Sequence, residues 1–371
     1  MGSRSIASIK TVRGLTMSPK REISWIEAAR TFLMILILLT EATNSYFFTD
    51  GKLPGTPFIV FRCFLYIGVP AFLTISGFLA GLGLEKEINT GAFIYKKFKV
   101  LMIPFFVWNV IYILYFKITA GADIFTESNL VSLLTGYIHL YFLFILFQLF
   151  VIFAIFKSFI ERHLNTALLI SFVSSFCTYI FMDITVWMGI HADQPFEWSM
   201  LAIFLPWLFF FFLGIKLGHA PELFKKLEDK LYIPLLIIGV IALAVYSYEM
   251  QLSGEILKTF PRGYFFLGGF FYELAISLFT IMTFRKLYST GTNSRIGQYF
   301  IDSGKDTFAI YLAQLLVRDL LTLAFLKYIH SSIPWYTIAS TVFTWILIQV
   351  VVRAIRNSRL PQINTILFGG R

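Results

Sequence analysis

The stretch ISWIEAARTFLMILILLTEATNSYFF, residues 23–48, decides the fold. Its length and apolar character are those of a membrane-spanning helix, because about 20 apolar residues are needed to cross a bilayer. It nevertheless carries three ionisable side chains, Glu27, Arg30 and Glu41. Charged side chains within a bilayer are costly, so they usually face protein or water and mark a functional site. The stretch therefore predicts a first membrane helix with one polar face.

The spacing of these three residues places them on the same side of the helix. Eleven residues advance an α-helix by three turns plus about 20°, so Arg30 and Glu41 share a face and lie roughly 16 Å apart along the axis. Glu27 lies one turn before Arg30 on nearly the same face. A structural ion pair between Glu27 and Arg30 near the lipid headgroups is the alternative to a functional role.

The rest of the chain has the composition of a polytopic membrane protein. Its 371 residues are 57% hydrophobic and 14% charged, against about 25% charged in soluble domains, and the mean hydropathy is +0.75. We expect an all-α integral membrane protein with about ten transmembrane helices. The predicted spans are 24–46, 57–83, 100–120, 137–157, 165–183, 200–218, 231–249, 264–285, 306–327 and 334–354.

The charge distribution predicts the orientation of these helices. The chain has 31 lysine and arginine residues and a net charge of +10. Most of the basic residues fall near the two termini and in every second predicted connection, as expected when positive segments stay in the cytoplasm. Both termini are therefore predicted to be cytoplasmic, and the basic charge indicates orientation rather than nucleic-acid binding. The expected organisation is a basic segment (1–22), a membrane domain (23–356) and a short basic tail (357–371).

The predicted membrane helices contain few side chains that can do chemistry. The sequence has no Walker, dinucleotide-binding, zinc-protease or Cys/His pattern, which leaves ATP-driven transport and metal chemistry without support. Arg62, near the outer start of the second span, is expected to pair with Glu41 and so to lower the cost of burying both. His139 lies at the outer end of the fourth span, where an interfacial hydrogen bond is the alternative to catalysis.

A basic cluster, Lys96, Lys97 and Lys99, lies in the predicted cytoplasmic connection before the third span. Lysine ammonium groups bind phosphate as point charges, so the cluster is suited to a phosphorylated cytoplasmic ligand. Anchoring to anionic lipid headgroups explains the same pattern equally well. In the ninth span, Gln314 and Arg318 are four residues apart and share a face.

Five motifs, in order, resemble the membrane acyltransferase-3 family. They are IEAAR at 26–30, SGFL at 76–79, YKKFKVLMIPFFVW at 95–108, HLYFL at 139–143 and GKDTFAIYLAQ at 304–314, and they extend over nearly the whole chain. The resemblance implies an integral-membrane O-acyltransferase of the bacterial cytoplasmic membrane. It also implies acetyl-CoA as the acyl donor, no metal, and an extracytoplasmic glycan or lipid-linked sugar as the acceptor. It defines no oligomeric state.

The resemblance also assigns roles to residues. Arg30 matches an arginine of the family's first helix, but the histidine eleven positions later, the base in the family, is replaced by Glu41. Lys96 and Lys99 stand where the family has a basic pair, usually arginines, and Gln314 stands where it often has histidine. The residues expected to bind CoA are Lys96, Lys97, Lys99 and Arg30, and those expected to contact the acceptor are Arg62, His139, Gln314 and Glu27.

The glutamate at position 41 leaves three interpretations open. The chain belongs to a lineage that uses a carboxylate as the base, or it is a non-catalytic relative, or the histidine has been substituted and activity is weakened. In the enzymatic hypothesis, the pantetheine arm of CoA follows the Arg30 face until the thioester reaches residue 41. A transporter or exporter of a glycan or small solute, with Arg30, Arg62 and Glu41 as a coupling path, is the other function considered. Its expected signature, matched broken helices in two halves, is weak here.

Overall fold

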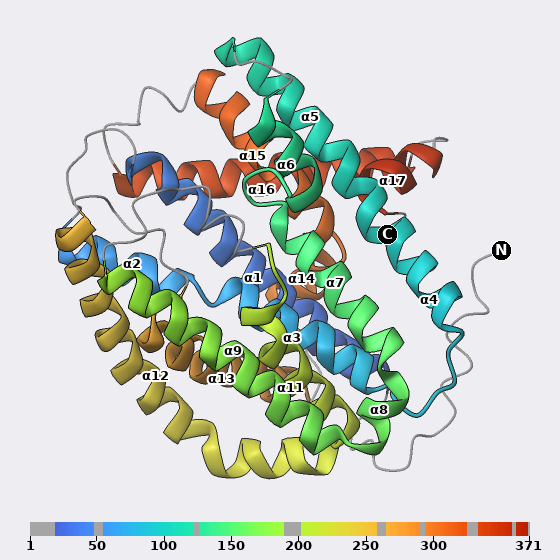
Figure 1. The fold of residues 1–371 in the computed structure, drawn as a ribbon. Coiled ribbons are helices and arrows are strands. Elements are labelled where there is room, and N and C mark those ends of the chain that lie inside the picture. Colours follow the sequence, from blue (N-terminus) through green and yellow to red (C-terminus); the bar gives the residue numbers. More distant parts are fainter. Residues whose placement is uncertain are drawn as a thin grey trace.

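The computed structural model describes residues 19–47, 55–121, 126–188, 202–257, 265–289, 294–324, 333–357 and 361–369. Within these ranges the chain forms helices joined by turns, without a β-strand (Figure 1), which confirms the all-α prediction. The first nine helices are α1 (Pro19–Phe47), α2 (Thr56–Leu65), α3 (Gly68–Gly81), α4 (Thr90–Lys97), the π-helix η1 (Phe98–Met102), α5 (Ile103–Ala120), α6 (Glu127–Thr135), α7 (Tyr141–Ile155) and α8 (Lys157–Arg162). The others are α9 (Leu164–Trp187), the 3-10 helix η3 (Leu205–Trp207), α11 (Leu208–His219), α12 (Pro221–Leu257), α13 (Leu267–Ser289), α14 (Arg295–Gly304), α15 (Thr307–Ala324), α16 (Ile333–Asn357) and α17 (Pro361–Phe368).

Seven helical stretches of the described chain are long and apolar enough to cross a membrane. They are Thr56–Gly81, Thr90–Thr119, Leu164–Trp187, Pro221–Glu255, Leu267–Tyr288, Thr307–Ala324 and Pro334–Asn357. Two further apolar stretches, Tyr141–Ile155 and Leu205–His219, are shorter, and the apolar part of α1 is interrupted by Glu27, Arg30 and Glu41. The protein is thus a multi-pass membrane protein in which a helix occupies each of the expected spans.

Parts of some predicted segments lie outside the described residues. These parts are 1–18 of the basic segment, 200–201, 264 and 325–327 of three predicted spans, and 358–360 and 370–371 of the tail.

Two of the expected spans are shorter than predicted, because the backbone departs from helical geometry where each was expected to start. In the expected span 137–157, the helix begins only at Tyr141, since Gly136 (φ +103°) and Ile138 (φ +49°) adopt left-handed conformations. In the expected span 200–218, Pro206 lies in the tight turn η3 and the α-helix begins at Leu208.

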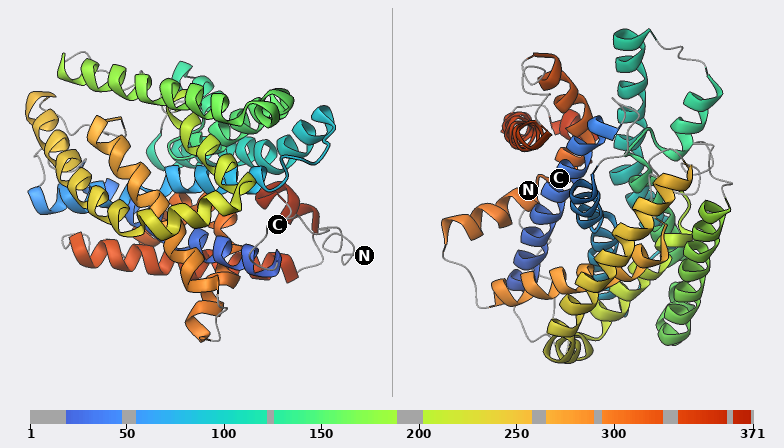
Figure 2. Two further views of the ribbon diagram at one scale, coloured as in Figure 1. Left: turned by 90° about the horizontal axis from the view of Figure 1, so that it is seen from below. Right: turned by 90° about the vertical axis from the view of Figure 1, so that its left-hand side faces the viewer.

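The first helix runs through the middle of the bundle (Figure 1, Figure 2) and packs against α3, α13, α14, α15 and α16. Trp25, Ala28 and Leu33 are fully buried on its apolar side. The end of α14 lies directly against the first part of α1. A Cβ on Gly304 of α14 would be only 2.3 Å from the carbonyl oxygen of Glu27. This packing fixes the apolar side of α1 in the core and determines where its polar face points.

Helices α3 and α11 pack with their backbones in contact. A Cβ on Gly77 would lie 1.9 Å from the carbonyl oxygen of Phe211, and one on Gly81 would lie 2.2 Å from the carbonyl oxygen of Ile215. Gly214 of α11 makes the reciprocal contact with α3. Small residues four apart permit this close approach in lipid, where van der Waals packing drives helix association. Gly77 and Gly81 therefore serve the close packing of α3 on α11.

The basic cluster lies where α4, η1 and α5 join into one long helix. Asn89 caps α4 by accepting a hydrogen bond from the backbone N–H of Ala92. Single π-helical turns within α-helices are frequent at functional sites, and η1 follows directly after Lys96 and Lys97. Beyond it, α5 packs against α17, and the indole Nε1 of Trp108 donates to the carbonyl oxygen of Leu367 at 3.0 Å.

Candidate functional site

A cavity of about 550 Å³ lies beside α1. Its walls are mainly apolar and include the aromatic rings of Phe72, Phe93, Phe142, Phe150 and Phe153. Its four basic lining residues are Arg30 of α1, Lys86 after α3, and Lys96 and Lys97 of α4. All four lie toward the end of the cavity where α1 begins and α3 ends, so we call this end the basic end.

A second, much smaller cavity of about 30 Å³ adjoins the first at the opposite end. The two share four lining residues, which are Ile37, Val69, Phe142 and Tyr311. The polar residues of the small cavity include Glu41 and His139. A volume of this size holds about one water molecule or one hydroxyl group.

One face of α1 forms a wall of both cavities. Arg30, Met34 and Ile37 line the large cavity, and Ile37 and Glu41 line the small one. Spacings of four, three and four residues keep these side chains on a single helical stripe. The structure therefore places Arg30 and Glu41 on one face, at opposite ends of a path that is roughly 16 Å long.

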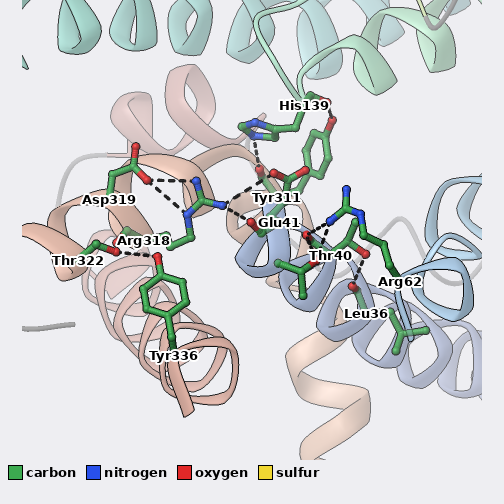
Figure 3. Close-up of polar contacts among 11 residues, drawn as sticks. Leu36, Thr40, Glu41, Arg62, His139, Tyr311, Arg318, Asp319, Thr322 and Tyr336 are labelled. Atoms are coloured by element: carbon green, nitrogen blue, oxygen red, sulfur yellow. Dashed lines mark hydrogen bonds and ion pairs between the residues drawn. The ribbon is translucent and has the colours of Figure 1, made fainter. Parts of the chain in front are cut away.

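The cation beside Glu41 comes from α15 (Figure 3). Nη1 of Arg318 lies 3.9 Å from Oε2 of Glu41 and also donates to the Glu41 backbone carbonyl. Nη2 of the same guanidinium lies 3.1 Å from Oδ1 of Asp319. The side chains of Glu41 and Arg318 are only 15% and 11% exposed. Arg318 thus lies between two carboxylates in a largely desolvated position.

Arg62 was expected to pair with Glu41, but the structure places it against the neighbouring turn of α1. Its Nη1 donates to the hydroxyl of Thr43 at 2.7 Å and to the carbonyl of Thr40 at 3.1 Å, and its Nε donates to the hydroxyl of Tyr66 at 3.0 Å. Arg62 is buried, and its bonds to Thr40 and Thr43 join α2 to α1. Thr40 and Tyr66 line the small cavity, whereas Arg62 is not one of its lining residues.

His139 is held in the turn that precedes α7. Its Nε2 lies 3.0 Å from the backbone carbonyl of Tyr311, and the hydroxyl of Tyr311 donates to the backbone carbonyl of His139. The imidazole is 4% exposed, and its Nδ1 has no hydrogen-bond partner within the described part of the chain. The same turn is fixed from α5, because the N–H of Tyr137 donates to Oδ1 of Asn109 at 2.6 Å.

Gln314 and Glu27, which were also expected to contact the acceptor, lie in different surroundings. Gln314 is 1% exposed on α15, one turn from Tyr311, and neither atom of its amide has a partner among the described residues. Glu27 pairs with Arg30 at 3.1 Å, at the basic end. Its position near Arg30 gives Glu27 a role in orienting this cation, and contact with an acceptor stays a prediction.

The three lysines of the basic cluster point in different directions. Lys97 lies 3.6 Å from the ring centre of Phe150, in cation–π contact with the wall of the large cavity. Lys96 is exposed and also lines the cavity. Lys99 is exposed and lies 5.1 Å over the ring of Tyr95, and it is not one of the residues that line the cavity.

Several residues of the site were not selected from the sequence. Arg318 and Tyr311 flank Gln314 on one face of α15, and a pattern of polar residues at this spacing was the available signal. Lys86 stands in the same basic connection as Lys96 and Lys97, but without a helical relation to them. Asn109 could have been noticed in the sequence only as a polar residue within an apolar run.

Comparison with known proteins agrees with this arrangement. Residues 23–353 match the profile of the acyltransferase domain of the acyltransferase 3 family. No curated protein and no solved structure matches the chain. The matched region begins in α1 and ends in α16, so it contains both cavities' main walls and confirms the resemblance in the sequence motifs. The chain belongs to the acyltransferase 3 family of membrane acyltransferases.

Proposed function

We propose that the protein transfers an acetyl group from acetyl-CoA, bound at the basic end, to a hydroxyl of an extracytoplasmic glycan or glycolipid. The observation that supports this most directly is the pair of adjoining cavities along α1. They connect Arg30, Lys96 and Lys97 at one end to Glu41 and His139 at the other. An acyl donor with a charged head and a long uncharged arm suits such a path.

The basic end fits the phosphate groups of CoA. Arg30 and three lysines line this end, and no acidic residue is among the described residues that line the large cavity. Glu27 is paired with Arg30. Ammonium and guanidinium groups bind phosphate oxygens through charge-assisted hydrogen bonds. The volume of the large cavity falls within the range of about 300–1,000 Å³ that is usual for small-molecule sites. Its apolar rings suit the pantetheine arm.

The far end has the groups that acyl transfer from a thioester to an alcohol needs. The reaction requires a base for the hydroxyl and donors for the negative charge that develops on the carbonyl oxygen. Glu41 and His139 are the candidate bases, and Arg318 is the nearby cation. The presence of this constellation around Glu41 favours an enzyme over a non-catalytic relative.

In this proposal the basic end faces the cytoplasm of a bacterium, and ten helices cross its cytoplasmic membrane with both termini inside. The distribution of lysine and arginine supports this orientation. Acetyl-CoA then enters from the cytoplasm, and the acceptor reaches the Glu41 end from outside. The proposed chemistry uses no metal.

The test is acetyl-CoA binding by the purified full-length protein, measured by calorimetry in lipid nanodiscs. The Lys96→Ala/Lys97→Ala variant should bind at least tenfold more weakly, because charged hydrogen bonds contribute about 1.5–3 kcal/mol each and about 1.4 kcal/mol corresponds to tenfold. Lys99→Ala, which removes one positive charge outside the cavity lining, is the control and should bind normally. Absence of acetyl-CoA binding by the wild-type protein would refute the proposal and favour transport.

A further inference from the structure

We infer that His139 is the general base that activates the acceptor hydroxyl, and that Glu41 stabilises the imidazolium that forms. This inference rests on the proposed acyl transfer and assigns its proton-transfer step. The histidine missing from the first helix is thus replaced by one from the turn before α7, across the same small cavity. Four observations support the assignment.

The first observation is the tautomer of His139. Nε2 lies 3.0 Å from the carbonyl oxygen of Tyr311, which can only accept a hydrogen bond. Nε2 of the neutral ring must therefore carry the proton, and Nδ1 carries the lone pair. Nδ1 is buried and has no partner among the described residues. An unpartnered lone pair on a buried histidine is the form that a general base takes before reaction.

The second observation is that the backbone is strained to hold the ring in place. Ile138, immediately before His139, has a φ of +49°. A β-branched residue in the left-handed region is rare and costs about 1–2 kcal/mol. Such strain persists where the surrounding structure enforces it, and it clusters at active sites. The constraint comes from the reciprocal bonds between His139 and Tyr311 and from the bond that the N–H of Tyr137, in the same turn, donates to Oδ1 of Asn109.

The third observation is the charge opposite the ring. The carboxylate of Glu41 lines the same cavity as His139, and Arg318 lies beside it. A carboxylate near an imidazole stabilises the imidazolium, which is the role that the acid has in a Ser-His-Asp triad. Glu41 is therefore placed to stabilise the imidazolium while His139 holds the proton.

The fourth observation is the size and position of the cavity. Its volume of about 30 Å³ has room for the reacting hydroxyl. It adjoins the large cavity at Ile37 and Tyr311, so a thioester reaching the end of the path arrives beside the ring of His139.

The proton-transfer step balances without another reactant. The hydroxyl proton of the acceptor moves to Nδ1 of His139 as the hydroxyl oxygen forms a bond to the thioester carbonyl carbon. The carbon–sulfur bond then breaks, and the departing sulfur takes the proton back from Nδ1. The products are an O-acyl ester and the free thiol of CoA, and His139 returns to its starting tautomer.

The first experiment uses S-bromoacetyl-CoA on the purified full-length protein, and does not need the acceptor. Nδ1 of His139 should attack the bromomethyl carbon, so that a carbon–nitrogen bond forms and bromide leaves. Peptide mass spectrometry should find the adduct on His139, distinct from any on Cys63 or Cys177. Acetyl-CoA should protect His139, and the control variant His163→Ala, at an exposed histidine, should be labelled normally. A protected adduct on Glu41 instead would overturn the assignment.

The second experiment measures transfer of the acetyl group from radiolabelled acetyl-CoA into the glycan and lipid fraction of membranes that contain the protein. His139→Ala should lower kcat by about 100-fold or more, the usual contribution of a general base, with the Kd for acetyl-CoA unchanged. Added imidazole should restore part of the rate, which a purely structural role for His139 would not allow.

The outcomes separate this inference from the proposed function. Normal acetyl-CoA binding together with unchanged transfer by His139→Ala refutes the base assignment alone. A rate increase in Glu41→His would likewise place the base at residue 41. Wild-type protein that neither binds acetyl-CoA nor is labelled by S-bromoacetyl-CoA refutes both, because there is then no transfer step for His139 to catalyse.

Discussion

Arg318 lies between the carboxylates of Glu41 and Asp319 and contacts both through its guanidinium. Two like charges in a low-dielectric region repel strongly, and each also loses hydration. A single guanidinium that contacts both offsets these costs. It also anchors α15 to α1 through the backbone carbonyl of Glu41.

The first prediction concerns this guanidinium. Arg318→Met should destabilise the protein by about 1–3 kcal/mol, between the values for exposed and fully buried ion pairs, because it leaves both carboxylates without their cation. The measurement is the melting temperature in detergent. Adding Asp319→Asn to Arg318→Met should recover part of the loss, since one carboxylate is then neutral. A single variant that melts like the wild type would show that the site is hydrated in the folded protein.

At the scale of the helix, the contact between α3 and α11 positions the wall of the large cavity. Gly77 and Gly81 allow α3 to lie against the backbone of α11, while Leu79 and Ala80 of the same turns line the cavity. A change in the distance between these helices therefore changes the shape of the large cavity as well as the stability of the bundle.

The second prediction follows from this contact. In Gly77→Ala the new methyl group would lie 1.9 Å from the carbonyl oxygen of Phe211, so the helices must separate. We expect a loss of about 1–3 kcal/mol, as for other overpacked sites, and weaker binding of acetyl-CoA. Gly91→Ala is the control, because its nearest neighbour would be a side-chain atom at 3.6 Å. Equal melting temperatures for the two variants would contradict the close packing.

The parts of the site that depend on local periodicity could be predicted from the sequence. Arg30 and Glu41 were placed on one face because a helix repeats every 3.6 residues, and this holds whatever packs around it. The pairing of Glu41 with Arg318 was not predicted, since 277 residues separate them and only the packing of α15 on α1 brings them together. Arg62 was chosen instead because it stood in the next span.

The turn that holds His139 was also missed, for a different reason. The apolar run from Tyr137 to Leu143 predicts a continuous helix, and isoleucine carries no signal for a positive φ. The left-handed conformation of Ile138 is enforced by contacts with α5 and α15, which are distant in sequence. Sequence patterns report local preference, and here tertiary contacts overrule it.

For the whole molecule, the orientation in the membrane decides which compartment supplies each substrate. The helix formed by α4, η1 and α5 offers a direct test, because Lys99 in η1 and Thr119 near the end of α5 are both exposed. They are about 30 Å apart along the helix, the thickness of the hydrocarbon core.

The third prediction is that these two positions face opposite compartments. In a Cys177→Ser background, Lys99→Cys should react with a membrane-impermeant maleimide only in inside-out vesicles, and Thr119→Cys only in right-side-out vesicles. The buried Cys63 should stay unreactive in both. The reverse pattern would place the basic end outside, away from cytoplasmic acetyl-CoA.

The small cavity at His139 and Tyr311 also has a consequence for the cell's energy supply. A path that follows α1 for roughly 16 Å reaches across about half of the hydrocarbon core. A column of water along such a path would dissipate the membrane potential, which stores about 2.3 kcal/mol per charge for every 100 mV. The small cavity at the end of this path has room for only about one water molecule, and the reciprocal bonds of His139 and Tyr311 lie beside it. In the proposed reaction, the protein would therefore present an uncharged acyl group to the other side while the bilayer stays electrically sealed.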